Sequence, residues 1–134
     1  MIHLNIELLK NKKILYVEDD DSIVNSFMPI FKKVFKEVLL ANNGQDGYSL
    51  FKKNQDIDFV ITDIKMPRMD GLDMCKAIKE IKPKLPCIIT TAHAEKEYLK
   101  KADKIGIYKY ITKPLNVKDL IATLTNLAEQ KEKA

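Results

Sequence analysis

Residues 59–71 read FVITDIKMPRMDG, and this stretch places an acid almost directly after a strongly apolar segment. Phe59, Val60 and Ile61 form a short run typical of a buried strand, and Asp63 follows after a single threonine. A carboxylate in such a place costs several kcal/mol unless it is paired or binds a metal. Asp63 is therefore either a solvated strand end or a group held in place for chemistry.

The rest of the chain alternates between strand-like and helix-like segments. Short apolar runs rich in β-branched residues occur at 13–17, 38–40, 59–61, 87–89 and 107–111. Helical spacing lies between them, most clearly at 117–128 and at 70–81, where Ile81 is expected to point inward. Five strands alternating with five helices predict an α/β fold, namely a doubly wound five-stranded parallel sheet with helices on both faces.

Three local features qualify this prediction. Pro29 falls inside the first expected helix, roughly 22–35, where it should kink the helix. Gly47 falls inside the second helix at a cost of about 1 kcal/mol relative to alanine, and we interpret both residues as tolerated local strain. The apolar residues of 2–9 fit a strand or a helix, so that segment stays open.

Composition excludes several classes of function. No apolar run approaches the roughly 18 residues that span a bilayer, and no signal peptide is evident. The net charge is +4, but the lysines are spread along the chain and Arg68 is the sole arginine, so we expect no nucleic-acid binding. Cys75 and Cys87 lack CxxC spacing, which favours reduced, buried thiols in a cytoplasmic protein.

Polar residues follow the expected strands at their carboxyl ends, which meet at one edge of a parallel sheet. These residues are 18–21 (EDDD), Asp63, Thr90, Thr91 and 112–114 (TKP). Clustered carboxylates repel one another, and Mg²⁺ and an ammonium group would offset that repulsion. Ligands bind at this edge in open α/β sheets, so we expect the functional site here. We interpret Asp20 and Asp21 as helix-start residues.

Four motifs in this order resemble the receiver domain of two-component response regulators and are similar to those of chemotaxis regulators. They are ILYVEDD at 14–20, TDIKMPRMDG at 62–71, Thr91-Ala92, and Lys113-Pro114. The resemblance implies a flavodoxin-like sheet with strand order 2-1-3-4-5. It divides the chain into an N-terminal extension (1–11), the receiver domain (12–128), and a polar tail or linker start (129–134).

The resemblance also implies what the site residues do. Asp63 matches the phosphoacceptor, which takes a phosphoryl group from a histidine kinase or a phosphotransfer protein. Asp19 matches a direct Mg²⁺ ligand and Glu18 a ligand acting mostly through water, with Asp63 and the backbone carbonyl of Lys65 completing the set. Lys113 matches the lysine that pairs with the phosphoryl group, and its bond to Pro114 is implied to be cis.

A switch is implied as well. Thr91 matches the hydroxyl residue of the family's switch, and Tyr110 matches its aromatic residue. Movement of these two residues is implied to change a surface formed by about 95–104 and 108–130. Lys65 and His93 match positions flanking the water that hydrolyses the acyl phosphate, and neither supplies a carboxylate or amide to orient it. We therefore expect both to lengthen the phosphorylated state.

The implied role is that of a signalling phosphoacceptor, not an enzyme, acting on a downstream protein or a covalent output domain. A homodimer of the phosphorylated form stays open. The alternative is a small-molecule enzyme on the same sheet. A phosphatase with an aspartate nucleophile would carry a second aspartate where Lys65 stands, and a flavin protein would carry a loop rich in Ser, Thr and Gly where residues 18–21 stand.

Overall fold

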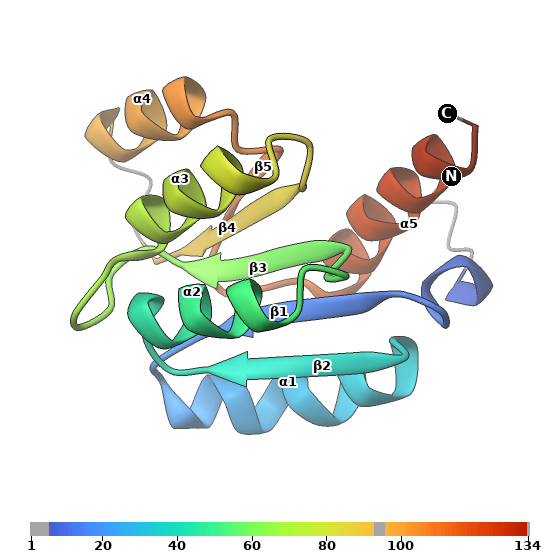
Figure 1. Ribbon diagram of the computed structural model, residues 1–134. Helices are drawn as coiled ribbons and strands as arrows, with labels where there is room; N and C mark the ends of the chain where they lie inside the picture. Colours follow the sequence, from blue (N-terminus) through green and yellow to red (C-terminus); the bar gives the residue numbers. More distant parts are fainter. Residues whose placement is uncertain (1–5, 93–95, 134) are drawn as a thin grey trace.

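The computed structural model describes residues 6–92 and 96–133 and contains one parallel five-stranded sheet (Figure 1). The strand order is β2-β1-β3-β4-β5, and every neighbouring pair is parallel. The strands are β1 (Lys13–Val17), β2 (Glu37–Ala41), β3 (Phe59–Asp63), β4 (Cys87–Thr91) and β5 (Lys109–Thr112). The predicted fold class and strand order are both confirmed.

Helices cover both faces of the sheet (Figure 1). They are η1 (Ile6–Leu9, a 3₁₀ helix), α1 (Asp21–Val34), α2 (Gly44–Lys53), α3 (Gly71–Ile81), α4 (Lys96–Ile105) and α5 (Val117–Lys133). Side chains of η1, α1 and α5 form one apolar core, while those of α2, α3 and α4 form the other. The central strands β1, β3 and β4 contribute to both cores, which explains why they are apolar throughout.

Two sequence predictions about individual elements are wrong. The last strand begins at Lys109 and not at Ile107, because the preceding residues complete the turn after α4, where the Ile107 N–H bonds to the Ala102 carbonyl. Ile81 does not point inward: it is the last residue of α3, lies beyond the end of the core, and is 43% exposed.

The first and last elements of the described residues pack together. Residues 6–9, within the segment left open as strand or helix, form η1, which contacts α5 and buries Leu9 completely; residues 2–5 lie outside the described residues. Residues 129–133, expected as a polar tail or linker start, continue α5. The extension before Lys12 therefore contributes to the core.

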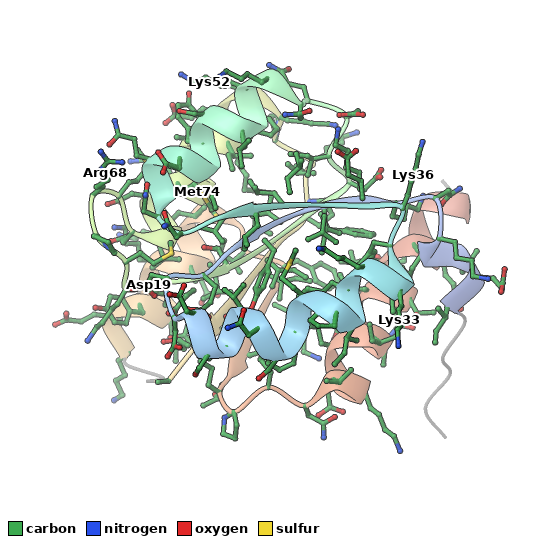
Figure 2. The ribbon with its side chains drawn as sticks, turned by 90° about the horizontal axis from the view of Figure 1, so that it is seen from below. Asp19, Lys33, Lys36, Lys52, Arg68 and Met74 are labelled. Carbon is green, nitrogen blue, oxygen red and sulfur yellow. The ribbon has the colours of Figure 1, made fainter. Side chains whose placement is uncertain are left out.

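Pro29 and Gly47 lie in helices, as predicted, but Gly47 has a packing reason. Pro29 lies inside α1, which continues on both sides of it. A Cβ at Gly47 would lie 2.6 Å from Met74 Sδ and 2.9 Å from Val17 Cγ2. Figure 2 shows the Met74 side chain on the side of the sheet that α2 covers. The glycine thus lets α2 approach β1 and α3 closely, and its interpretation as tolerated strain was incomplete.

We predict that Gly47→Ala lowers the free energy of unfolding. Alanine gains about 1 kcal/mol of helix propensity, but overpacking a core typically costs about 1–3 kcal/mol. Urea denaturation should show a net loss of roughly 1 kcal/mol. Ser49→Ala, on the exposed face of the same helix, is the control and should not destabilise the protein. A stabilised Gly47→Ala variant would show that the contact relaxes freely.

Candidate functional site

Carboxylates from two strands converge at the carboxyl edge of the sheet. Glu18 and Asp19 follow β1, and Asp63 ends β3, whose register places Thr62 beside Val17. One ligand oxygen from each of the three acids lies within 4.8 Å of the others. Figure 2 shows Asp19 at this end of the molecule, where α1 begins. The acids predicted from the strand ends are therefore brought together.

Lys113, which directly follows β5, bonds to two of these acids. Its Nζ lies 2.8 Å from Glu18 Oε1 and 3.1 Å from Asp63 Oδ2. Burial lowers the pKa of Lys113, but the hydrogen bonds and charges of Glu18 and Asp63 outweigh it and hold that pKa above its usual range. For Glu18, only 1% exposed, burial raises the pKa despite the opposing ammonium. Within the described residues, the Lys113 ammonium is thus shared by two of the three acids.

The loop after β3 fixes the Asp63 carboxylate. Asp63 Oδ1 accepts a hydrogen bond from its neighbour Ile64 N–H at 2.8 Å, which leaves Oδ2 toward Lys113. The Gly71 N–H bonds back to the Ile64 carbonyl at 2.8 Å, closing the loop. A Cβ at Gly71 would lie 1.8 Å from the Asp63 carbonyl oxygen, so only glycine allows this closure. This close approach explains why the motif TDIKMPRMDG ends in glycine.

The remaining acids of residues 18–21 begin a helix, as predicted. Asp20 is the N-cap of α1, and its Oδ1 accepts hydrogen bonds from the Ser22 and Ile23 N–H groups. These bonds, led by the one from Ile23, hold the pKa of Asp20 below its usual range. Asp21 is the first residue of the helix, where its charge is favourable.

The residues assigned to the switch lie on neighbouring strands. Thr91 is the buried last residue of β4, and Tyr110 is half-buried on β5 against the core that α2, α3 and α4 cover. Lys65 lies in the loop two residues after Asp63, and His93 lies outside the described residues. The Lys113–Pro114 peptide is cis, as the resemblance implied.

The donor set fits a hard divalent cation. Mg²⁺ is usually bound by one or two carboxylates and keeps several waters, and this site offers three carboxylates at bridging distance. Asp19 is exposed and so accessible to such an ion, whereas Glu18 is already bonded to Lys113. The cluster is typical of Mg²⁺ binding.

An apolar hollow beside the site was missed by sequence reasoning. It has a volume of about 420 Å³ and is lined by Ile23, Phe27, Ala92, Lys113, Pro114 and Leu115. The available signal was the spacing of Ile23 and Phe27, four apart and hence on one face of α1, but partly buried core residues show the same spacing. The hollow adds an apolar surface beside Lys113.

Comparisons with known proteins agree with this site. A sequence model of the response regulator receiver domain matches residues 14–125. The chain is 34% identical to the chemotaxis protein CheY-3 of Vibrio cholerae, with 92% of this chain and 96% of that protein covered. It is 35% identical to the transcriptional regulatory protein ZraR of Escherichia coli, with 92% of this chain covered but only 26% of that protein.

A solved complex of CheX and CheY with BeF₃ and Mg²⁺ from Borrelia burgdorferi contains a chain of the same fold. Its TM-score is 0.81 at 25% identity, covering 92% of this chain and 94% of that one.

The fold, the acidic cluster at the carboxyl edge of the sheet with a lysine bonded into it, and the receiver-domain match together define a class of signalling modules. Within that class, this chain belongs to the response regulator receiver domain family. Membership decides against the alternative of a phosphatase or flavin enzyme. Among the described residues, no helix is long and apolar enough to cross a membrane.

We predict that Lys113→Met destabilises the protein by about 1–3 kcal/mol, because it leaves buried Glu18 without its charged partner. Lys101→Met is the matched control: Lys101 bonds to Asp73 at 2.7 Å, but these side chains are 43% and 52% exposed. Exposed pairs contribute less than about 1 kcal/mol. Equal losses in urea denaturation for the two variants would contradict the importance of the Lys113 contacts.

Proposed function

We propose that Asp63 accepts a phosphoryl group from a phosphohistidine. The observation that carries this proposal is the position of the Asp63 carboxylate, with one oxygen fixed by Ile64 N–H and the other 3.1 Å from the Lys113 ammonium. Phosphoryl transfer depends mainly on positioning and on neutralising charge. A new O–P bond forms at Asp63 while the N–P bond of the donor breaks, and its electron pair stays on the imidazole.

We propose Mg²⁺ as the cofactor, with Asp19 and Asp63 as carboxylate ligands, Glu18 acting through water, and the Lys65 carbonyl as a further ligand. The close approach of the three acids supports this assignment, as does the Mg²⁺ in the name of the Borrelia complex. When bound, the ion supplies positive charge to the phosphoryl oxygens. Lys113 supplies the second positive charge and orients the acceptor.

The proposed donor is a histidine kinase or a phosphotransfer protein that contacts the apolar hollow beside Lys113. Ile23 and Phe27 offer the donor an apolar surface next to the reacting group, which supports this docking. Because the chain spans 26% of ZraR, an output domain on the same chain and a separate downstream protein both fit. We place the protein in the cytoplasm, in agreement with its two free, buried thiols.

The proposed output couples Asp63 to the face of α4, β5 and α5. Thr91 would move toward a phosphoryl oxygen and Tyr110 would turn inward, which shifts the population between two packings. Exposed Leu99 and Tyr108 on this face offer a partner, or a second copy of this chain, an apolar contact. The proposed domain remains 12–128, although η1 and the end of α5 extend the same fold.

The direct test is Asp63→Asn. The variant should fold normally but take up no Mg²⁺-dependent label from a phosphohistidine donor, because the carboxamide is nearly isosteric but a far poorer nucleophile. Mass spectrometry after incubation with phosphorylated donor checks the result, with Asp21→Asn as a control that keeps full labelling. Stoichiometric acid-labile phosphate on Asp63→Asn would refute the assignment.

The metal assignment predicts an order of affinities. Asp19→Asn should weaken Mg²⁺ binding strongly and Glu18→Gln less, because Asp19 is assigned as a direct ligand. Asp19→Asn should also raise the melting temperature without metal, since it removes repulsion and leaves the Lys113 contacts intact. Calorimetric titration with MgCl₂ gives the order, and the reverse order would exchange the two roles.

The third prediction concerns the lifetime of the phosphorylated state. The long Lys65 stem and bulky His93 should exclude water, so loss of phosphate should take minutes or longer. Lys65→Asn introduces an amide that can orient a water and should speed the loss several-fold. Phosphate release after removal of acetyl phosphate measures both rates. Decay of the parent within seconds, or an unchanged rate in the variant, would show that Lys65 shields nothing.

A further inference from the structure

The ammonium of Lys65 lies over an aromatic ring of another element. Lys65 Nζ is 5.7 Å from the ring centroid of Tyr98, in the first turn of α4. A cation within about 6 Å of such a centroid is attracted to the face of the ring. This contact joins the loop that carries Asp63 to the helix that follows the strand of Thr91.

Of the two partners, the ring is the better fixed. Tyr98 is half-buried and packs against the core covered by α2, α3 and α4, as do Met66 from the Lys65 loop and Tyr110. Lys65 is exposed, and its ammonium sits on a flexible four-carbon stem. The ammonium can therefore move to a new partner while the ring stays in place.

We propose that Tyr98 is a positioning residue for Lys65. In the unphosphorylated protein the ring holds the ammonium toward α4, and a phosphoryl group on Asp63 draws it away. This inference rests on the proposed phosphorylation of Asp63, which lies two residues from Lys65. A phosphoryl group brings a charge of about −1.5 to −2 and three acceptor oxygens, a stronger attraction than a ring quadrupole.

The exchange would matter because α4 is weakly anchored. Of the described residues of α4, Ala102 is the buried one, while Leu99 is 38% exposed. The contact of Lys65 with Tyr98 therefore adds to the Lys101–Asp73 bond and to the core packing of Tyr98 and Ile105 in placing α4. Phosphorylation would break the contact of Lys65 with Tyr98 and so free the first turn of α4, which belongs to the proposed output face.

The chain offers a matched control pair. Lys52 Nζ lies 4.6 Å from the ring centroid of Tyr48, one turn earlier in α2. The chemistry is the same, but both residues belong to one helix, so no change in the Asp63 loop should affect the pair.

The first arm of the test measures the contact itself. In the NMR spectrum without ligand, the Lys65 side-chain protons should show an upfield ring-current shift that Tyr98→Phe keeps and Tyr98→Leu removes. Adding beryllofluoride with Mg²⁺ should remove the shift in the parent protein. The Lys52 shift should disappear only in Tyr48→Leu and should not respond to beryllofluoride.

The second arm measures competition for the ammonium. Because the ring no longer competes, Tyr98→Leu should bind beryllofluoride about two- to fivefold more tightly, the factor expected for an exposed cation–π pair. Tyr98→Phe should bind as the parent does. In a Lys65→Met background, which keeps the stem and removes the charge, Tyr98→Leu should change nothing.

The results test the positioning role, the exchange on phosphorylation and the proposed function separately. An equal gain from Tyr98→Leu with and without the Lys65 charge would overturn the positioning role, since the effect would then run through α4 packing. A Lys65 shift unaffected by beryllofluoride that does bind would overturn the exchange. Absence of Mg²⁺-dependent beryllofluoride binding would instead overturn the proposed function and the exchange with it, while the shift without ligand still tests the contact.

Discussion

The site depends on one ammonium group held between two carboxylates. Lys113 Nζ bonds to Glu18 and Asp63, which lie 95 and 50 residues away in the chain. Without that charge, three acids with ligand oxygens within 4.8 Å would repel one another at the end of a buried sheet. The lysine thus makes an acidic cluster compatible with a folded protein, and it leaves Asp19 exposed toward solvent. The same charge neutralises the group that the cluster is proposed to receive, so stability and chemistry share one interaction.

Parallel topology is what brings these groups together. In this sheet every strand ends at the same edge, so residues that follow β1, β3, β4 and β5 become neighbours without being close in sequence. The register adds detail, since Asp63 pairs with Thr90 and Thr91 with Thr112. Two apolar cores hold the strands from opposite faces, and α1 in one layer and α3 in the other begin next to the site. A change in structure at the carboxyl edge of the sheet can therefore alter the helices on either face directly.

Much of this arrangement could be predicted from the sequence, because it follows from periodicity and from residues at strand ends. The strand order came from resemblance, and the cluster of Glu18, Asp19 and Asp63 from the rule that parallel strands end at one edge. What failed depends on tertiary distances. Ile81 fits the apolar spacing of α3, but the core ends before it. The reason for Gly47 in α2 is the close approach of Met74 and Val17, which sequence spacing does not reveal. The contact of Lys65 with Tyr98 has no sequence signature, because the exposed lysine and the half-buried tyrosine are 33 positions apart and belong to different elements.

The glycines at the start of α2 and α3 have a consequence for how substitution data on this domain should be interpreted. At Gly44 and Gly71 an added Cβ would meet backbone, 2.1 Å from the Met69 carbonyl oxygen and 1.8 Å from the Asp63 carbonyl oxygen. The Gly44 N–H also donates to that Met69 oxygen at 3.0 Å. The two glycines thus contact Asp63 and Met69, on either side of the loop after β3, through their own main-chain atoms alone. A map of tolerated substitutions would therefore group them with the acids and the lysine, although they have no side chain to offer a reaction. Intolerance around this loop measures how closely two backbones approach as well as where the chemistry occurs.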